Sequence, residues 1–263
     1  MSPAAALALA AGLAVAGAAL GWLTPGGAVA ATTVGAAVLW GSGLPGGVLL
    51  AVFFVSGSAL TYARRKSHPD LPRPRRYRGR VWRQVAANGG WAATGAWIVA
   101  LHPPVGWPIL VGSLAAAQAD TWGTEIGRLS PRPPRLITSG RRVPPGTSGA
   151  VSWLGTVAGI AGAGLLSAAA ALLGVGPSAA VAGLVGGITG TVADSVLGAT
   201  VQGRFHCVTC DRDTEQARHD CPDRAAPAGG IGWIDNDVVN LLATTVGAGV
   251  ALGVAGVLGA WDV

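Results

Sequence analysis

Acidic side chains stand at the ends of three apolar segments of this 263-residue chain. Asp120 and Glu125 close one segment, Asp194 closes a second, and Asp235 and Asp237 open the last. An ionisable group at membrane depth is costly and is usually retained for function. Mg²⁺ is bound by one or two carboxylates together with substrate phosphates. The pattern predicts a catalytic site in which Asp120 and Asp194 hold Mg²⁺ and the other three carboxylates take part.

The spacing of Asp120 and Glu125 sets a geometric condition on that site. On a regular helix the two side chains point about 140° apart, whereas Thr124 shares the face of Asp120. Both carboxylates reach one site only if the helix unwinds near Gly123. Alternatively, Glu125 lies in the following loop, or Gly123 and Gly127 form a helix-packing motif and the acids are interfacial.

Further polar side chains near these helix ends are predicted to bind substrate. Arginines suit phosphate oxygens, and Arg128 is such a candidate together with the arginines named below. A glycine-containing turn at a helix start offers backbone N–H groups to anions. Asp and Asn at a helix start are also common caps, so one residue of 235–237 is expected to be only a cap. The predicted substrate-binding residues are Asn88, Thr124, Arg135, Arg141, Arg142, Gly146, Thr147, Ser148, Gln202, Asn236 and Asn240.

A second, softer set of ligands lies in the segment 202–235. Cys207, Cys210, His219 and Cys221 make a set suitable for a tetrahedral Zn²⁺ ion with a structural role. His206 is an alternative to His219. The other interpretation is a group of reduced cysteines that bind no metal.

Composition indicates what holds these residues. Charged residues make up 11% of the chain, apolar residues 51%, and there are 42 glycines. Soluble domains contain about 25% charged residues. We therefore expect an all-α polytopic membrane helix bundle of seven or eight spans, forming one domain over residues 1–263. The expected spans are residues 4–23, 28–40, 45–62, 81–101, 105–123, 150–174, 178–200 and 237–260, and the short run 28–40 either crosses tilted or re-enters.

The distribution of positive charge predicts the orientation. All 18 Lys and Arg fall in three blocks, 64–83, 128–142 and 204–224. With eight spans these blocks share one side, and positive loops mark the cytoplasm. We expect a plasma-membrane protein whose polar site faces the cytoplasm, with residues 102–104 and 175–177 outside. The net charge of +6 therefore does not indicate nucleic-acid binding.

Several stretches together resemble a known family. They are Ser56–Leu60, Ala87–Gly90, Ala119–Gly127, Arg135–Gly149, Asp194–Gln202 and Asp235–Asn240. They resemble the transmembrane protein 19 family, domain of unknown function 92, which includes the plant phytyl-phosphate kinase of tocopherol biosynthesis. A more distant similarity is to dolichol kinase, phytol kinase and CDP-diacylglycerol synthase, enzymes that use CTP and Mg²⁺ on lipid substrates. Those enzymes usually carry a Lys in the turn where this chain has Arg142-Val143-Pro144.

The resemblance implies a kinase that converts an isoprenoid monophosphate, such as phytyl, farnesyl or geranylgeranyl phosphate, to the diphosphate. The expected partners are the prenyl-phosphate lipid and a nucleoside triphosphate, with CTP preferred, and a homodimer is possible. Two alternatives stay open: a transporter or flippase of a phosphorylated lipid, and a cytidylyltransferase that acts on a lipid phosphate. Polar residues gathered at one face, instead of through the midplane, favour an enzyme.

Overall fold

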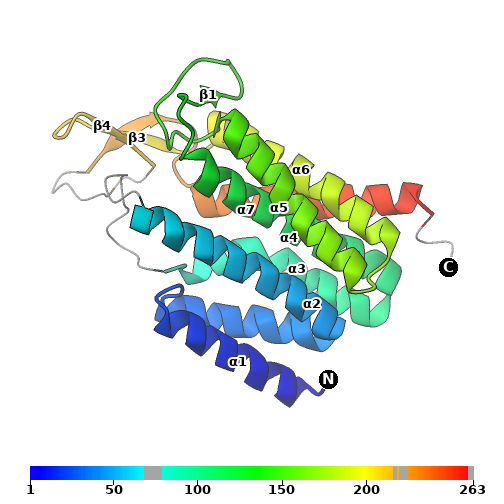
Figure 1. Cartoon of the computed structure of the whole chain (residues 1–263). Coiled ribbons are helices and arrows are strands. Elements are labelled where there is room, and N and C mark those ends of the chain that lie inside the picture. The colour runs from blue at the N-terminus through cyan, green and yellow to red at the C-terminus, as the bar shows by residue number, and fades with distance from the viewer. Residues whose placement is uncertain (68–78, 216–217, 219–223, 260–263) are drawn as a thin grey trace.

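The chain folds into a bundle of helices whose long axes run between two ends of the molecule (Figure 1). The computed structural model describes residues 1–67, 79–215, 218 and 224–259. The helices in this part are α1 (Pro3–Ala19), α2 (Pro25–Ser67), α3 (Trp82–Leu101), α4 (Pro103–Gly127), α5 (Trp153–Leu172), α6 (Pro177–Thr200) and α7 (Asn236–Val257). The expected all-α membrane fold is confirmed.

Helix α2 is two helical segments joined at Gly43. Gly43 has φ 67° and ψ −160°, a conformation that glycine adopts without the steric cost other residues incur. The chain reverses there, so the two halves of α2 run in opposite directions (Figure 1). The first half begins at Pro25 and not at residue 28, because proline is well suited to the first turn of a helix. The short run predicted at 28–40 is therefore part of a longer helix that lies beside α1 and α3.

Four helices of the described chain are long and apolar enough to cross a membrane, namely α2, α5, α6 and α7. Helix α1 is apolar but has 17 residues. Counting the halves of α2 separately, the helical segments follow the order predicted from the sequence. The chain is therefore an integral membrane protein whose number of spans is set only approximately by length and composition.

Helix α4 lies at the centre of the bundle, in contact with α2, α3, α5, α6 and α7. Its residues from Pro108 to Ala119 are all buried. Small residues allow this density: a Cβ atom built on Gly190 of α6 would lie 2.5 Å from the Cβ atom of Ala116. Packing of small residues is a main source of helix association in lipid. Gly183, Gly186, Gly187 and Gly190 of α6 are all packed against neighbouring helices in this way.

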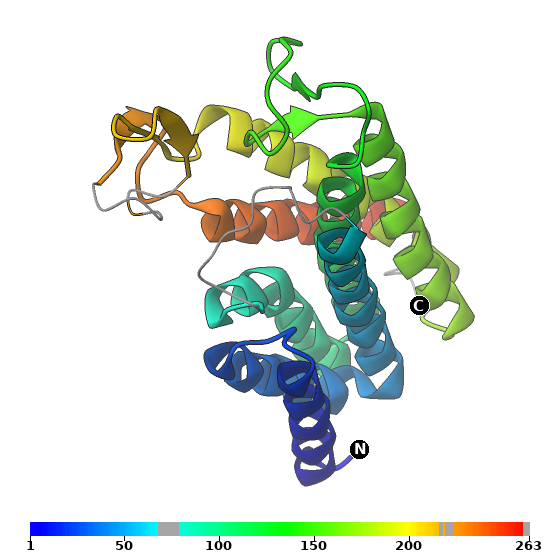
Figure 2. The same ribbon diagram turned by 60° about the vertical axis from the view of Figure 1, so that its left-hand side comes forward.

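Short strands, which the sequence analysis did not predict, order the loops at one end of the bundle. Strands β1 (Arg135–Leu136) and β2 (Ala150–Val151) pair antiparallel, and β3 (Arg204–Cys207) lies between β4 (Arg212–Thr214) and β5 (Ala226–Gly229). Figure 2 shows these strands beyond the ends of α4, α6 and α7. Both ends of the described chain lie at the opposite end of the bundle (Figure 1).

Candidate active site

A cavity of about 1600 Å³ opens at the loop end of the bundle. Every helix contributes to its wall. Among the predicted site residues, those that line it are Asn88, Asp120, Thr124, Glu125, Gly146, Thr147, Ser148, Asp194, Gln202, Asp235, Asn236, Asp237 and Asn240. Residues from distant parts of the sequence therefore meet in one polar space.

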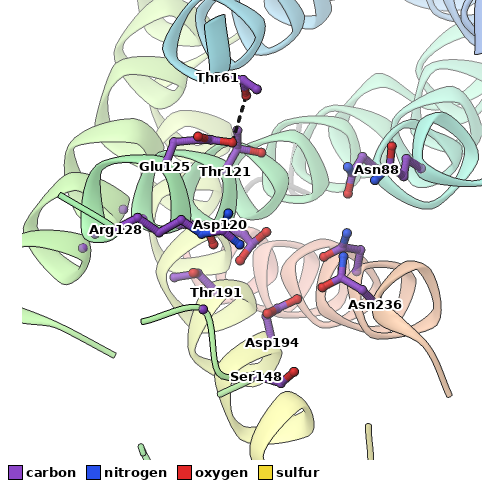
Figure 3. A pocket seen from close by; sticks show the side chains of 18 of the residues that line it. Thr61, Asn88, Asp120, Thr121, Glu125, Arg128, Ser148, Thr191, Asp194 and Asn236 are labelled. Carbon is purple, nitrogen blue, oxygen red and sulfur yellow. Dashed lines mark hydrogen bonds between the residues drawn. The ribbon is translucent and has the colours of Figure 1, made fainter. Parts of the chain in front are cut away.

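Asp120 of α4 and Asp194 of α6 form the acidic centre of this cavity. The close packing of α6 on α4 brings their side chains within hydrogen-bond range of each other. Thr124 follows Asp120 by one helical turn and lines the same cavity. Figure 3 shows Asp120 and Asp194 facing the same space, with Asn88 and Asn236 across from them. The two carboxylates predicted as a metal pair thus lie together.

The chemistry of these two carboxylates fits a hard cation. The Oδ2 atom of Asp194 is buried and has no hydrogen-bond partner among the described residues. Two carboxylates in contact repel one another unless a proton or a cation lies between them. Within the described part of the chain no group of three or more His, Cys, Asp and Glu side chains could hold a metal. Mg²⁺ is compatible with two protein carboxylates, since waters and substrate phosphates complete its shell.

Glu125 does not join this pair. Helix α4 continues through Gly127 without unwinding, so Glu125 points toward α2. There it forms an ion pair with Arg64, and it accepts a hydrogen bond of 2.9 Å from the Thr61 hydroxyl group. Both carboxylates line the same cavity although the helix does not unwind, and Glu125 lies in the helix, on the α2 side of the cavity, instead of in the following loop. Gly123 instead packs against α5, where its Cβ would lie 3.2 Å from the Gly155 carbonyl oxygen.

Asp235 and Asp237 are both engaged by Arg83 at the start of α3. Arg83 lies 2.8 Å from Asp235 Oδ2 and 3.6 Å from Asp237 Oδ2. The other Asp235 oxygen accepts from the backbone N–H groups of Asp237 and Val238, which makes Asp235 the N-cap of α7. The expected capping role is confirmed, and the ion pairs hold α3 and α7 together at the cavity rim.

The turn 144–149 lies farther from a helix start than predicted. Helix α5 begins at Trp153, because Ala150 and Val151 pair with the segment at Arg135 as strand β2. Gly146, Thr147 and Ser148 still line the cavity, and Ser148 donates a hydrogen bond to Glu215. Of the four arginines predicted to bind phosphate, Arg128 lines the cavity, whereas Arg135, Arg141 and Arg142 are exposed and do not line it.

Amide side chains also form part of the cavity wall. Gln202 is buried beside Gly198, and its Nε2 atom has no acceptor among the described residues. Asn88 and Gln84, four residues apart on α3, both line the cavity. Gln84 in addition accepts from the Val81 backbone N–H and so caps the start of α3.

The predicted zinc ligands cannot be compared as a set, because His219 and Cys221 lie outside the described residues. Cys207 is buried in β3 and Cys210 is exposed in the turn that follows. His206, the alternative ligand, lies 2.9 Å from Asp213 across the β3–β4 pair. The zinc site stays a prediction.

Comparison with known proteins places the chain among its relatives. Residues 8–248 match the family described as integral membrane protein DUF92. The chain belongs to this family. The resemblance noted in the sequence is therefore confirmed.

Several known proteins are similar to this chain over half of its length or more. Protein PGR of Arabidopsis thaliana is 30% identical over 74% of this chain and 76% of its own length. Protein VTE6, chloroplastic, of the same plant is 26% identical over 88% of this chain and 64% of its own length. An uncharacterized membrane protein of Methanocaldococcus jannaschii is 35% identical over 56% of this chain, which spans about half of that protein, 49%. No solved structure matches the chain.

Four cations that line the cavity of this DUF92 protein were not among the predicted site residues: Arg65, Lys66, Arg80 and Arg83. Arg80 lines the cavity beside the second half of α2. In the sequence it is one of many arginines in the proline-rich block 64–83. The available signal was its position directly after Gly79 and before the apolar run of α3.

Proposed function

We propose that this DUF92 protein is a membrane kinase that transfers a phosphoryl group from a nucleoside triphosphate, with CTP preferred, to an isoprenoid monophosphate. The observation that carries the proposal is the contact between Asp120 and Asp194 at the wall of a cavity that arginines also line. The family relationship to protein VTE6 and the resemblance to phytyl-phosphate kinase support the lipid class.

The chemistry needs little covalent help from the protein. In a phosphoryl transfer, an oxygen of the acceptor phosphate forms a bond to the terminal phosphorus of the nucleotide. The bond from that phosphorus to the bridging oxygen breaks, and a nucleoside diphosphate leaves. The acceptor is already ionised, so no strong general base is required. Catalysis then rests on positioning and charge stabilisation.

Asp120 and Asp194 would hold Mg²⁺, which when bound would offset the repulsion between the two polyanions. The two residues reach this place because α4 and α6 pack through small residues and end at the same side of the bundle. The amides of Asn88, Gln202 and Asn236 line the same cavity and can orient phosphate oxygens.

The cavity also has an apolar part suited to a prenyl chain. Ile160 of α5 and Ile188 and Val192 of α6 line it. Ile160 and Val192 are 45% and 48% exposed, so this wall opens toward the lipid. An isoprenoid tail there would extend between α5 and α6 while its phosphate reaches the carboxylates.

The test is a product analysis. Purified protein is incubated with farnesyl, geranylgeranyl or phytyl phosphate, each nucleoside triphosphate in turn, and Mg²⁺, and the products are identified by mass spectrometry. The proposal expects a prenyl diphosphate and a nucleoside diphosphate. A nucleotidyl lipid with released pyrophosphate would identify a cytidylyltransferase. The absence of any product, combined with movement of prenyl phosphate across vesicles, would identify a transporter.

A further inference from the structure

The backbone of Arg80 is fixed against the turn that joins α1 to α2. The Arg80 N–H donates to the Trp22 carbonyl oxygen at 2.8 Å, and the Arg80 carbonyl oxygen accepts from the Thr24 N–H at 3.1 Å. Gly79 makes this contact possible, because a Cβ there would lie 2.6 Å from the Leu23 backbone nitrogen. The side chain of Arg80 therefore leaves a rigid anchor.

The guanidinium group extends from this anchor over aromatic rings of α2. Its Cζ atom lies 4.9 Å from the ring centroid of Phe53 and 5.4 Å from that of Phe54. Aromatic faces stabilise a cation without neutralising it. A Cβ built on Gly57 would lie 2.7 Å from Arg80 Nη2 and 3.0 Å from Thr121 Cγ2, so the guanidinium sits beside the residue that follows Asp120.

Arg80 differs from the nearby arginines Arg64 and Arg83 in its charge pairing. Arg64 pairs with Glu125, and Arg83 pairs with Asp235. No ion pair joins Arg80 to a carboxylate in the part of the chain that the structure describes. Burial lowers the pKa of Arg80 to about 10, an effect that the more distant charge of Glu125 opposes. The group stays protonated at neutral pH, and a partly desolvated cation of this kind gains most from an anionic ligand.

We propose that Arg80 is a phosphate-binding residue of the cavity and recognises a phosphate group of the lipid headgroup or of the nucleotide. The planar guanidinium can donate two parallel hydrogen bonds to phosphate oxygens, an arrangement that Lys does not reproduce. The inference rests on the proposed function for the identity of the ligands. It assigns to Arg80 the role that the sequence analysis gave to Arg135, Arg141 and Arg142.

The test measures binding without catalysis. Affinities of the purified protein for farnesyl phosphate and for CTP are measured by calorimetry in detergent without Mg²⁺. We expect Arg80→Gln to weaken binding of at least one of them roughly 10-fold or more. Arg80→Lys should recover part of that loss. The ligand that loses affinity identifies whether Arg80 contacts the lipid phosphate or the nucleotide.

Gly57, which lies beside the guanidinium group, supplies a variant that does not replace Arg80 itself. Gly57→Ala places a methyl group 2.7 Å from Arg80 Nη2, a separation too short for the guanidinium to stay where it is, and should weaken binding of the same ligand. Gly90→Ala in α3 is the matched control, because nothing lies within 4 Å of its Cβ. It should bind within about two-fold of wild type. Thermal unfolding of each variant shows whether it is folded. If the Arg80 variants do not fold, the affinities of Gly57→Ala test the role of Arg80.

The outcomes separate this inference from the proposed function. Unchanged affinity for both ligands in folded Arg80→Gln, or in folded Gly57→Ala, would overturn the role of Arg80 even if the protein is a kinase. Conversely, weakened binding in these variants with no phosphoryl transfer by wild type would retain the anion site and overturn the kinase.

Discussion

Asp120 and Glu125 are neighbours in sequence, but the structure gives them different surroundings. Asp120 meets a second carboxylate across α4 and α6, whereas Glu125 is matched by Arg64. The difference arises because α4 stays helical through Gly127 and directs the two side chains to different helices. At the residue scale, therefore, Asp120 and Asp194 are candidate catalytic residues, and Glu125 is a residue whose ion pair stabilises the fold.

Removing either member of the acidic pair should stop catalysis. We expect Asp120→Asn and Asp194→Asn to lower Mg²⁺-dependent product formation by about 100-fold or more, since a fixed charge at the reacting phosphates is lost. Expression, thermal unfolding and prenyl-phosphate binding should remain close to wild type. Asp213→Asn, in the exposed β3–β4 pair, is the control with full activity. Wild-type rates in either cavity variant, or full activity in excess EDTA, would remove the pair from the mechanism.

Breaking the Glu125 pair should instead affect stability. The side chains of Arg64 and Glu125 are 8% and 14% exposed. Glu125→Gln leaves the Arg64 charge buried without its partner, which costs about 3 kcal/mol. The expected readout is a lower thermal unfolding temperature in detergent. The double variant Arg64→Met with Glu125→Met should recover most of the loss, and a double variant as unstable as the single one would contradict this account.

At the scale of elements, glycines determine how near the helices come and thus where side chains meet. Gly155 of α5 packs on α4 so closely that a Cβ there would lie 2.8 Å from the Gly123 carbonyl oxygen. The pair Gly123 and Gly127, weighed from the sequence as a packing motif, is such a motif. This contact holds the end of α4 that carries Asp120.

A larger residue at this contact should separate α4 from α5. Gly155→Val is expected to reduce stability by about 1–3 kcal/mol through overpacking. Gly164→Val is the matched control on the same helix, since its Cβ meets nothing within 4 Å. Both variants change helix propensity alike, so their difference in unfolding temperature reports the contact. Equal effects of the two variants would refute the packing argument.

The β3–β4 pair should respond to pH through His206. The hydrogen bond to Asp213 raises the pKa of His206, with smaller contributions from the charges of Asp213 and Asp211, against a lowering by partial burial. Because the folded pKa is the higher one, the stabilisation is complete below the ordinary value of about 6.5 and is lost as pH rises through the folded value. The protection of the amides of residues 204–214, measured as the intrinsic exchange rate at each pH divided by the observed rate, should therefore fall from pH 6 to pH 8.

Asp213→Asn provides the comparison for that measurement. It removes the hydrogen-bond acceptor charge, so the pKa of His206 in the variant should fall toward its ordinary value. An NMR titration of the imidazole protons measures it directly. An unchanged titration curve would mean that Asp213 does not hold the proton on His206.

At the scale of the whole molecule, the polar loops gather at one end and the chain ends at the other (Figure 1). Described residues of all three basic blocks, among them Arg80, Arg128 and Glu215, line the cavity, while the turns after α3 and α5 lie at the far end. This arrangement agrees with a chain of eight helical segments, in which the loops after the third, fifth and seventh segments lie at the same end. The assignment of the loop end to the cytoplasm stays a prediction from the positive charges.

Labelling should place the two ends on opposite sides of the membrane. In a background without native cysteines, Arg132→Cys should react with an impermeant thiol reagent only after the membrane is opened. His102→Cys should react in intact cells. Both positions are exposed in the structure. Reaction of both from the same side would invalidate the topology.

Sequence alone determined the properties that depend on composition and local order. Low charge and long apolar runs predicted the membrane bundle, and the three basic blocks predicted that the polar loops share one end. Asp120 and Asp194 were identified as candidate site residues from their positions at helix ends, because a carboxylate is costly at that depth in a membrane. Asp235 as a cap followed from its place before an apolar run.

Only the tertiary structure decided which charges are matched and which face the cavity. Glu125, Asp235 and Asp237 have arginine partners from other helices, and such long-range pairing leaves no local pattern in the sequence. Arg80 lies in the cavity because its backbone is bound to the turn at residues 22–24, a contact between segments far apart in the chain. The contact between Asp120 and Asp194 likewise required α6 to pack on α4, since helix spacing is set by the small residues of both surfaces.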